Sequence, residues 1–290
     1  MCVTCGCSET DQVAVVDLVT GDQRMMSHEA AHAHGHSHAH DDSNKTDHAH
    51  TLDHHREHAH SHDGAAAATA KAHSRTIGLE QEILGKNQLI AERNRGWLAA
   101  KRILALNLVS SPGSGKTSLL EHTLFALKDE FEIGVIEGDQ ETIHDAERIR
   151  ATGCKAVQIN TGTGCHLEAD MLERGLAGLD PGDNSLLFIE NVGNLVCPAL
   201  FDLGEHAKVA ILSVTEGEDK PLKYPHMFRA SEIMILNKID LLPYVKFDVD
   251  RSIAYAREVN PEIKVLQLSA TTGEGCGEWH QWLRETRAIL

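Results

Sequence analysis

The sequence predicts an α/β fold over residues 103–290, with a doubly wound, mostly parallel β-sheet. Two observations support this prediction. Short, nearly continuous apolar runs recur along the chain, at 103–109, 132–138, 155–160, 185–191, 208–214, 232–238 and 264–269. Between most of them lie stretches with helical patterning, such as 116–130 and 141–152. Buried strands that alternate with helices indicate a sheet covered on both faces, and ligands then bind beyond the carboxyl ends of the strands.

Composition excludes several classes of protein. The 290 residues carry a formal charge of −16, whereas a nucleic-acid surface would require clustered Lys and Arg. An apolar run long enough to span a membrane is absent, and the first residues lack the basic and apolar regions of a signal peptide. Seven cysteines, an odd number, do not suggest a disulfide framework. We therefore expect a cytoplasmic protein with reduced thiols that binds neither membrane nor nucleic acid.

Three segments precede the α/β domain. Residues 1–26 form a tip that begins with Cys2, Cys5 and Cys7, whose thiolates are spaced closely enough to wrap a metal ion. Residues 27–74 hold a histidine-rich tract, which we expect to be disordered because it has almost no apolar side chains. Residues 75–102 have the apolar spacing of an amphipathic helix, broken or frayed near Gly85, that packs on the domain.

Thirteen of the twenty histidines lie in residues 27–62. Imidazole is a ligand for Ni²⁺, Zn²⁺ and Cu²⁺, so we expect this tract to buffer or store several ions at low affinity. The alternative is a spacer of accidental composition. The ligands we expect are His32, His34, His36, His38, His40, His48, His50, His54, His55, His58, His60 and His62.

A phosphate-binding loop follows the first predicted strand. The segment "SSPGSGKTS" (110–118) matches G-x-x-x-x-G-K-[ST] except that Ser110 replaces the first Gly. Lys116 is expected to reach the β- and γ-phosphates, and the Thr117 hydroxyl to ligate Mg²⁺. The backbone around these residues would hold the phosphates, with contributions from Gly113, Ser114, Gly115 and Ser118.

The segment "NKID" (237–240) points to guanine. Asp240 can accept hydrogen bonds from N1 and the 2-amino group of guanine, a pair that adenine does not offer. Asn237 and Lys238 would brace this loop and lie along the base. "SATTGEG" (269–275) supplies a second loop, with the backbone of Ser269 and Ala270 near the guanine carbonyl.

The γ-phosphate side is less standard. "ENVG" (190–193) stands where many GTPases have D-x-x-G, so Glu190 takes the acidic position and Gly193 donates its N–H. "EGDQ" (137–140) places Asp139 near Mg²⁺. Asn194 follows the glycine instead of the glutamine that orients water in Ras-like proteins, which predicts slow hydrolysis. The residues we expect to act in catalysis are Lys116, Thr117, Asp139, Glu190 and Gly193.

Two loops at the same sheet edge carry metal-ligating side chains. Cys165 and His166 follow the third predicted strand, and Cys197 lies four residues beyond Gly193. Two cysteines and a histidine beside a γ-phosphate loop predict a transition-metal site. Only three ligands come from one chain, so a fourth must be water, another side chain or a second subunit.

These motifs together resemble the HypB family of GTPases, which assist nickel insertion during [NiFe]-hydrogenase maturation. The resemblance rests on "MCVTCGC", "SSPGSGKTS", "EGDQ", "NTGTGCHL", "ENVGNLVCPA", "SVTEGEDKPLKYP" and "NKIDLLPY". It implies a SIMIBI-class GTPase that dimerises and works with the accessory protein HypA on the hydrogenase large-subunit precursor. It also implies a tight nickel site at Cys2, Cys5 and Cys7, and a nickel or zinc site at Cys165, His166 and Cys197.

Three other interpretations remain open. The histidine tract favours a nickel or zinc storage protein, although the complete guanine site argues against it. The related GTPase of urease maturation shares the fold, but the cysteine tip and "ENVGNLVCP" favour the hydrogenase branch. "NKID" disfavours a P-loop kinase. Square-planar Ni²⁺ and tetrahedral Zn²⁺ both remain candidates for the tip.

Overall fold

The computed structural model describes residues 12–17, 23–27, 63–139, 144–162 and 164–290. Within them, nine strands form one sheet in the order β2-β1-β5-β4-β6-β3-β7-β8-β9. The seven strands from β3 to β9 pair in parallel, which confirms the predicted fold class. Their bounds are β3 Leu104–Ser110, β4 Ile133–Asp139, β5 Lys155–Asn160, β6 Leu186–Glu190, β7 Ala207–Ser213, β8 Ile233–Asn237 and β9 Lys264–Gln267.

Two further strands were missed by the sequence analysis. β1 (Gln12–Asp17) and β2 (Gln23–Ser27) pair as an antiparallel hairpin, and β1 also pairs antiparallel with β5. Residues 12–17 and 23–26, which the sequence analysis assigns to the N-terminal tip, therefore belong to the sheet. Val15 is buried, and one of its methyl groups lies close to Gly178. The apolar run that begins at Val13 is thus a strand of the sheet, between the outermost strand β2 and β5.

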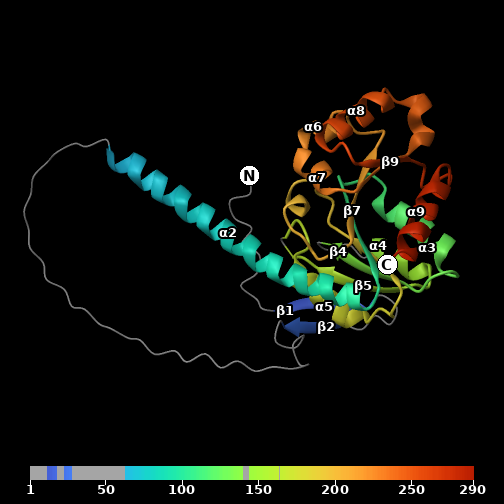
Figure 1. Cartoon of the computed structure of the whole chain (residues 1–290), viewed down its shortest axis with the longest axis horizontal. Helices are drawn as coiled ribbons and strands as arrows, with labels where there is room; N and C mark the ends of the chain where they lie inside the picture. The colour runs from blue at the N-terminus through green and yellow to red at the C-terminus, as the bar shows by residue number, and fades with distance from the viewer. Residues whose placement is uncertain (1–11, 18–22, 28–62, 140–143, 163) are drawn as a thin grey trace, which may run out of the picture.

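Helices cover both faces of the sheet, as Figure 1 shows. On one face, α3 (Lys116–Leu127), α4 (His144–Ala151) and α9 (Cys276–Ala288) contribute to one apolar core with Phe188 and Trp279. The other face is covered by α2 (Asp63–Ala100), α5 (Ala169–Leu179), α7 (Pro225–Ala230) and α8 (Val249–Val259). Short helical turns, α6 (Lys220–Lys223), η1 (Cys197–Ala199) and η2 (Ile239–Tyr244), lie in the connections. The carboxyl ends of the strands remain available for a site.

The predicted amphipathic helix is longer than expected. α2 runs from Asp63 to Ala100, so residues 63–74, which we had assigned to the histidine tract, are helical. It also passes through Gly85 without a break, contrary to the prediction. An exposed glycine costs a helix only about 1 kcal/mol, and buried contacts of the following turns compensate for it. Among them, the Asn94 amide donates to the carbonyls of Ala169 and Leu203.

None of the described helices is both long and apolar enough to cross a membrane. The prediction of disorder for the histidine tract covers residues 27–74. It is wrong for Ser27, which ends β2, and for residues 63–74, which are helical; residues 28–62 lie outside the described part of the chain.

A pair of histidines joins α3 to α9. The rings of His122 and His280 stack with centroids 5.4 Å apart, and each has one buried nitrogen without a hydrogen-bond partner. Burial lowers the pKa of His280, and the nearby His122 and Arg284 lower it further, against a smaller opposing effect of Glu130. The folded protein therefore resists protonation of His280.

This arrangement predicts that acid destabilises the protein through His280. Below about pH 6.5 the unfolded chain takes up a proton that the folded chain does not. The free energy of unfolding therefore decreases as the pH is lowered, by up to about 1.4 kcal/mol per pH unit for one such group. We expect His280→Leu to reduce the difference in free energy of unfolding between pH 7.5 and pH 5.5, measured with urea. His226→Leu, at an exposed position on α7, is the control and should leave that difference as it is. An unchanged pH dependence in His280→Leu would refute this prediction.

Candidate nucleotide and metal site

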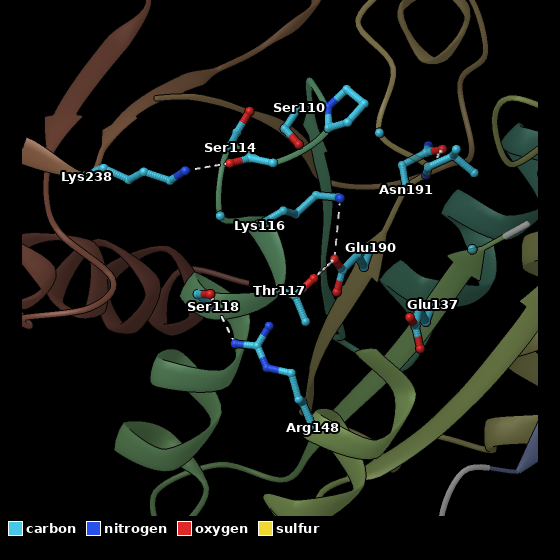
Figure 2. A pocket seen from close by; sticks show the side chains of 16 residues that line it. Ser110, Ser114, Lys116, Thr117, Ser118, Glu137, Arg148, Glu190, Asn191 and Lys238 are labelled. Atoms are coloured by element: carbon cyan, nitrogen blue, oxygen red, sulfur yellow. Dashed lines mark hydrogen bonds and ion pairs between the residues drawn. The ribbon is translucent and has the colours of Figure 1, made fainter. Parts of the chain in front are cut away.

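A pocket of about 540 Å³ lies at the carboxyl ends of β3, β4 and β6 (Figure 2). Most of its lining comes from the predicted phosphate loop and from "ENVG". The lining residues are Ser110, Pro112, Gly113, Ser114, Gly115, Lys116, Thr117, Ser118, Glu137, Gly138, Arg148, Glu190, Asn191, Val192, Gly193 and Lys238. The structure therefore brings the predicted phosphate and γ-phosphate residues together, with Glu137, Arg148 and Asn191 in addition.

The phosphate loop turns through two glycines with left-handed backbones. Gly113 has φ 76° and Gly115 has φ 91°, and a Cβ at Gly115 would lie 2.5 Å from Nδ2 of Asn237. Only glycine fits this turn without strain. α3 begins at the next residue, with no side-chain cap and no acidic residue in its first turn. The positive end of the helix therefore faces the pocket, an arrangement that attracts anions.

Glu190 joins the "ENVG" segment to the phosphate loop. Its Oε1 accepts a 2.7 Å hydrogen bond from Thr117 Oγ1 and lies 3.4 Å from Lys116 Nζ, contacts that Figure 2 displays. The side chain is buried, and Oε2 has no hydrogen-bond partner. A buried carboxylate oxygen without a partner beside a hydroxyl suits a hard cation. Asp139 ends β4, but its side chain lies outside the described residues.

A carboxylate that the sequence analysis missed fixes the phosphate loop from behind. Glu216 Oε1 accepts hydrogen bonds from Ser114 Oγ (2.8 Å) and from the backbone N–H of Ser213 (3.0 Å). Lys220 lies 3.1 Å from Oε2 and also donates to Ser111 Oγ. Burial alone would raise the pKa of Glu216, but these donors lower it below its ordinary value. The charged carboxylate is therefore part of the loop's support.

Asn237 connects the base-side loops to the phosphate loop. Its Nδ2 donates to the carbonyl of Ser114 at 2.9 Å, and its Oδ1 accepts from the N–H groups of Lys238 and Ala270. Lys238 Nζ donates to the carbonyl of Gly113 at 2.6 Å. These contacts give Asn237 and Lys238 the bracing geometry that the sequence predicts, and they bring "NKID" beside the loop of Ser269 and Ala270.

Asp240 lies on η2, just beyond this brace. Its Oδ1 is buried and has no hydrogen-bond partner. An unpaired buried acceptor is costly, so its presence suggests that a ligand donates to it. Apart from Lys238, the base-side residues lie outside the lining of the phosphate pocket.

The three predicted metal ligands of the domain are adjacent. The ligand atoms of Cys165, His166 and Cys197 lie within 4.8 Å of one another, with 3.0 Å between the two sulfurs and 3.7 Å between Cys165 Sγ and His166 Nδ1. Among the described residues, neither cysteine forms a disulfide. The His166 ring packs against Phe201, and burial lowers its pKa to about 4. The imidazole is therefore neutral at physiological pH, as a metal ligand must be.

Direct contacts join this cluster to the nucleotide pocket. Asn194 Nδ2 donates to the carbonyl of Cys165 at 3.3 Å, and Asn191 Oδ1 accepts from the N–H of Leu167 at 3.1 Å. The Leu167 side chain also lies where a Cβ of Gly138 would be, with its Cγ 2.6 Å from that point. The loop that bears Cys165 and His166 is thus held by residues that line or adjoin the pocket.

Two predicted groups of metal ligands fall outside the described residues. They are the tip cysteines, Cys2, Cys5 and Cys7, and the histidines of residues 28–62. Among the described residues, Glu216, Arg148 and Asn191 were not predicted as site residues. Arg148 lies outside the quoted motifs, and Glu216 and Asn191 lie within motifs in which the sequence assigns them no role.

A phosphate loop, a base-side "NKID" loop and a doubly wound parallel sheet define a P-loop GTPase fold. Residues 104–267 match the family model of the CobW/HypB/UreG nucleotide-binding domain. The hydrogenase maturation factor HypB of Escherichia coli K12 is 60% identical over 220 residues, which are 76% of either chain. HypB of Azotobacter vinelandii is 61% identical over 222 residues, which are 77% of this chain and 73% of that protein. The chain belongs to the HypB family of hydrogenase maturation factors.

Solved structures agree with this assignment. The crystal structure of HypB from Archaeoglobus fulgidus matches with a TM-score of 0.66 and 41% identity, over 70% of this chain and 99% of that one. HypB from Helicobacter pylori, in complex with nickel, matches with a TM-score of 0.65 and 38% identity, over 70% of this chain and 96% of that one.

Proposed function

We propose that this protein hydrolyses GTP and uses the nucleotide cycle to deliver nickel during [NiFe]-hydrogenase maturation. The observation that carries the proposal is the contact between Asn194 and Cys165, which joins the γ-phosphate loop directly to the thiol cluster. The family assignment supports the maturation role, and the nickel-bound relative from Helicobacter pylori supports nickel as the cargo.

Guanine would be read by Asp240. The buried Oδ1 supplies one acceptor for the base, and the brace at Asn237 keeps the loop beside the phosphate loop. Mg²⁺ would be held by Thr117 and Glu190, with Asp139 as a further carboxylate. When bound, this ion would neutralise charge on the β- and γ-phosphates.

Hydrolysis is expected to be slow. The side chain after Gly193 is the amide of Asn194, and it donates to the Cys165 carbonyl instead of orienting a water. The residue that orients water in Ras-like proteins is thus replaced here by Asn194, which contacts the loop of the thiol cluster. Lys116 and the N–H of Gly193 would bind the γ-phosphate, with Glu190 placed beside Lys116.

We propose that Cys165, His166 and Cys197 bind Ni²⁺ or Zn²⁺. Three ligands from one chain leave a position for water or for a second subunit. Val196 and Leu200 flank Cys197 and are 56% and 55% exposed, which supports a homodimer formed around this cluster. Partners by family resemblance are HypA and the hydrogenase large-subunit precursor, in the cytoplasm.

The cycle would work by linkage between the two sites. A γ-phosphate contact at Gly193 would shift the loop that carries Asn194 and Cys197, and with it the distances among the three ligands. The metal would then have different affinities in the GTP and GDP states, and linkage requires the metal to bias nucleotide binding by the same factor. Hydrolysis would in this way change the affinity of the site for nickel.

The first prediction concerns guanine. In Asp240→Asn, a donor would face a donor of guanine, so GTP affinity should fall by a few kcal/mol, as estimated for a buried unpaired group. The xanthine nucleotide, which has a carbonyl at C2, should bind better than it does to the unaltered protein. Titration with fluorescent derivatives of GTP and XTP measures both effects. GTP affinity retained within about twofold would show that Asp240 does not read the base.

The second prediction concerns coupling. We expect metal affinity of the full chain to differ between GDP and a GTP analogue, by about fivefold to a hundredfold if the coupling is of the usual size. Cys165→Ala and Cys197→Ala should abolish this difference while the tip at Cys2, Cys5 and Cys7 stays loaded. Asn194→Ala keeps all three ligands and should still reduce the difference. Competition with a chromophoric chelator measures these affinities.

Asn260→Ala is the matched control for Asn194→Ala. The Asn260 amide donates to the carbonyls of Phe228 and Ser231, between α7 and α8, and contacts neither site. Its removal should lower stability without changing the nucleotide dependence of metal affinity. Equal metal affinities with GDP and the GTP analogue in the unaltered protein would refute the coupling.

The third prediction concerns the histidine tract. We propose that residues 28–62 store ions through imidazoles, which must be neutral to bind metal, so loading should drop steeply below about pH 6. Deletion of the tract should remove most of the weakly bound Ni²⁺, measured by equilibrium dialysis, while the rate of GTP hydrolysis is kept. An unchanged ion stoichiometry after deletion would show that the tract is a spacer.

A further inference from the structure

Among the described residues, three cationic side chains line the nucleotide pocket, and one of them has no role in the proposed function. Lys116 contacts Glu190, and Lys238 donates to the carbonyl of Gly113. Both belong to recognised motifs. Arg148 comes from α4, which belongs to neither the phosphate loop nor the base-side loops.

The guanidinium of Arg148 lies against the start of α3. One terminal nitrogen donates to Ser118 Oγ at 3.0 Å and to Glu121 Oε2 at 2.6 Å, and Nε donates to the same carboxylate oxygen at 3.2 Å. In Figure 2, Arg148 and Lys116 lie on opposite sides of the first turn of α3, and Arg148 contacts Ser118. Glu121, one turn further along α3, holds the guanidinium at this position.

The position of a residue along the phosphate loop determines which phosphate of a bound nucleotide lies near it. Lys116 and Thr117 serve the β- and γ-phosphates and the metal in a loop of this type, while the backbone N–H groups hold the α- and β-phosphates. Ser118 is one residue further into α3, on the side away from the γ-phosphate loop of Glu190. A group fixed on Ser118 is therefore near the α-phosphate.

The chemistry of the position suits a phosphate oxygen. The first turn of α3 has no acidic side chain, and its positive end faces the pocket. An arginine there adds a planar set of donors that matches phosphate geometry better than a lysine does. Glu121 balances the charge of Arg148 without entering the lining of the pocket.

We propose that Arg148 binds the α-phosphate of a guanine nucleotide, with Glu121 as its positioning residue. The inference rests on the proposed function of the pocket. The α-phosphate is common to GTP and GDP, so Arg148 holds the nucleotide in both states and takes no part in sensing the γ-phosphate. It is a binding residue that slows nucleotide release after hydrolysis.

The test uses the full chain with fluorescent GDP and a non-hydrolysable GTP analogue. Arg148→Ala should weaken both nucleotides by the same factor, about tenfold or more for a lost charge-assisted contact. In steady-state hydrolysis the loss should appear in KM more than in kcat. Arg148→Lys should be intermediate because it keeps the charge but lacks the planar donors, and Glu121→Gln should give a smaller loss of the same kind.

Arg150→Ala is the matched control, since Arg150 is exposed on the same helix and does not line the pocket. It should leave both affinities unchanged. A loss confined to the GTP analogue, or to kcat, would overturn the proposal by assigning Arg148 to the γ-phosphate. Unchanged affinities with a lowered unfolding temperature would overturn it by showing a structural tie between α3 and α4. If the unaltered protein binds neither nucleotide, the proposed function fails first.

Discussion

The buried side-chain amide of Asn191 connects the pocket to the thiol cluster. Asn191 follows β6 directly, and its Oδ1 accepts from the N–H groups of Leu167 and Val192. Its Nδ2 donates to Asn107, whose own amide donates to Glu205. Because an unsatisfied buried polar group costs about 1–3 kcal/mol, the members of such a network keep each other in place. The start of "ENVG" and the loop of Cys165 therefore share one support.

This network ends in a buried ion pair. Glu205 Oε1 lies 2.9 Å from Lys208 Nζ, and Glu205 Oε2 accepts from the N–H of Leu203. Such a pair adds little net stability after desolvation, but breaking it leaves a buried charge. Its effect here is to fix Asn107 on β3, between the phosphate loop and β6. The two sites are thus built on neighbouring strands whose polar side chains have one satisfied arrangement.

Local chemistry explains which parts of this protein could be predicted from sequence. Lys116, Thr117 and Asp240 belong to motifs in which contiguous residues perform one task, so spacing alone identifies them. Cys165 and Cys197 were paired by a general property of parallel sheets, because the loops that follow parallel strands lie at the same edge of the sheet. Their ligand role stays a proposal, although the structure places them together.

Long-range contacts explain what was missed. Glu216 and Arg148 lie about 100 and 30 residues from the serines that they contact, and a lone charged residue carries no signal of its partner. The hairpin β1–β2 is recognisable only through its antiparallel pairing with β5. The sequence predicts a break in α2 near Gly85 because glycine has a low helix propensity, whereas buried contacts further along keep the helix continuous. In each case contacts between residues far apart in the sequence determine the local structure.

The packing at Leu167 shows why the two sites are expected to move together. Its side chain is fully buried and occupies the space that a Cβ of Gly138 would need, while its N–H bonds to Asn191. Gly138 lies between Glu137, which lines the pocket, and Asp139. Close-packed interiors shift between discrete arrangements instead of deforming gradually. A displacement of the strand end or of "ENVG" must therefore be accommodated by Leu167, and His166 is its immediate neighbour in the chain. The thiol cluster contacts the pocket through packing as well as through hydrogen bonds, so the proposed coupling does not depend on Asn194 alone.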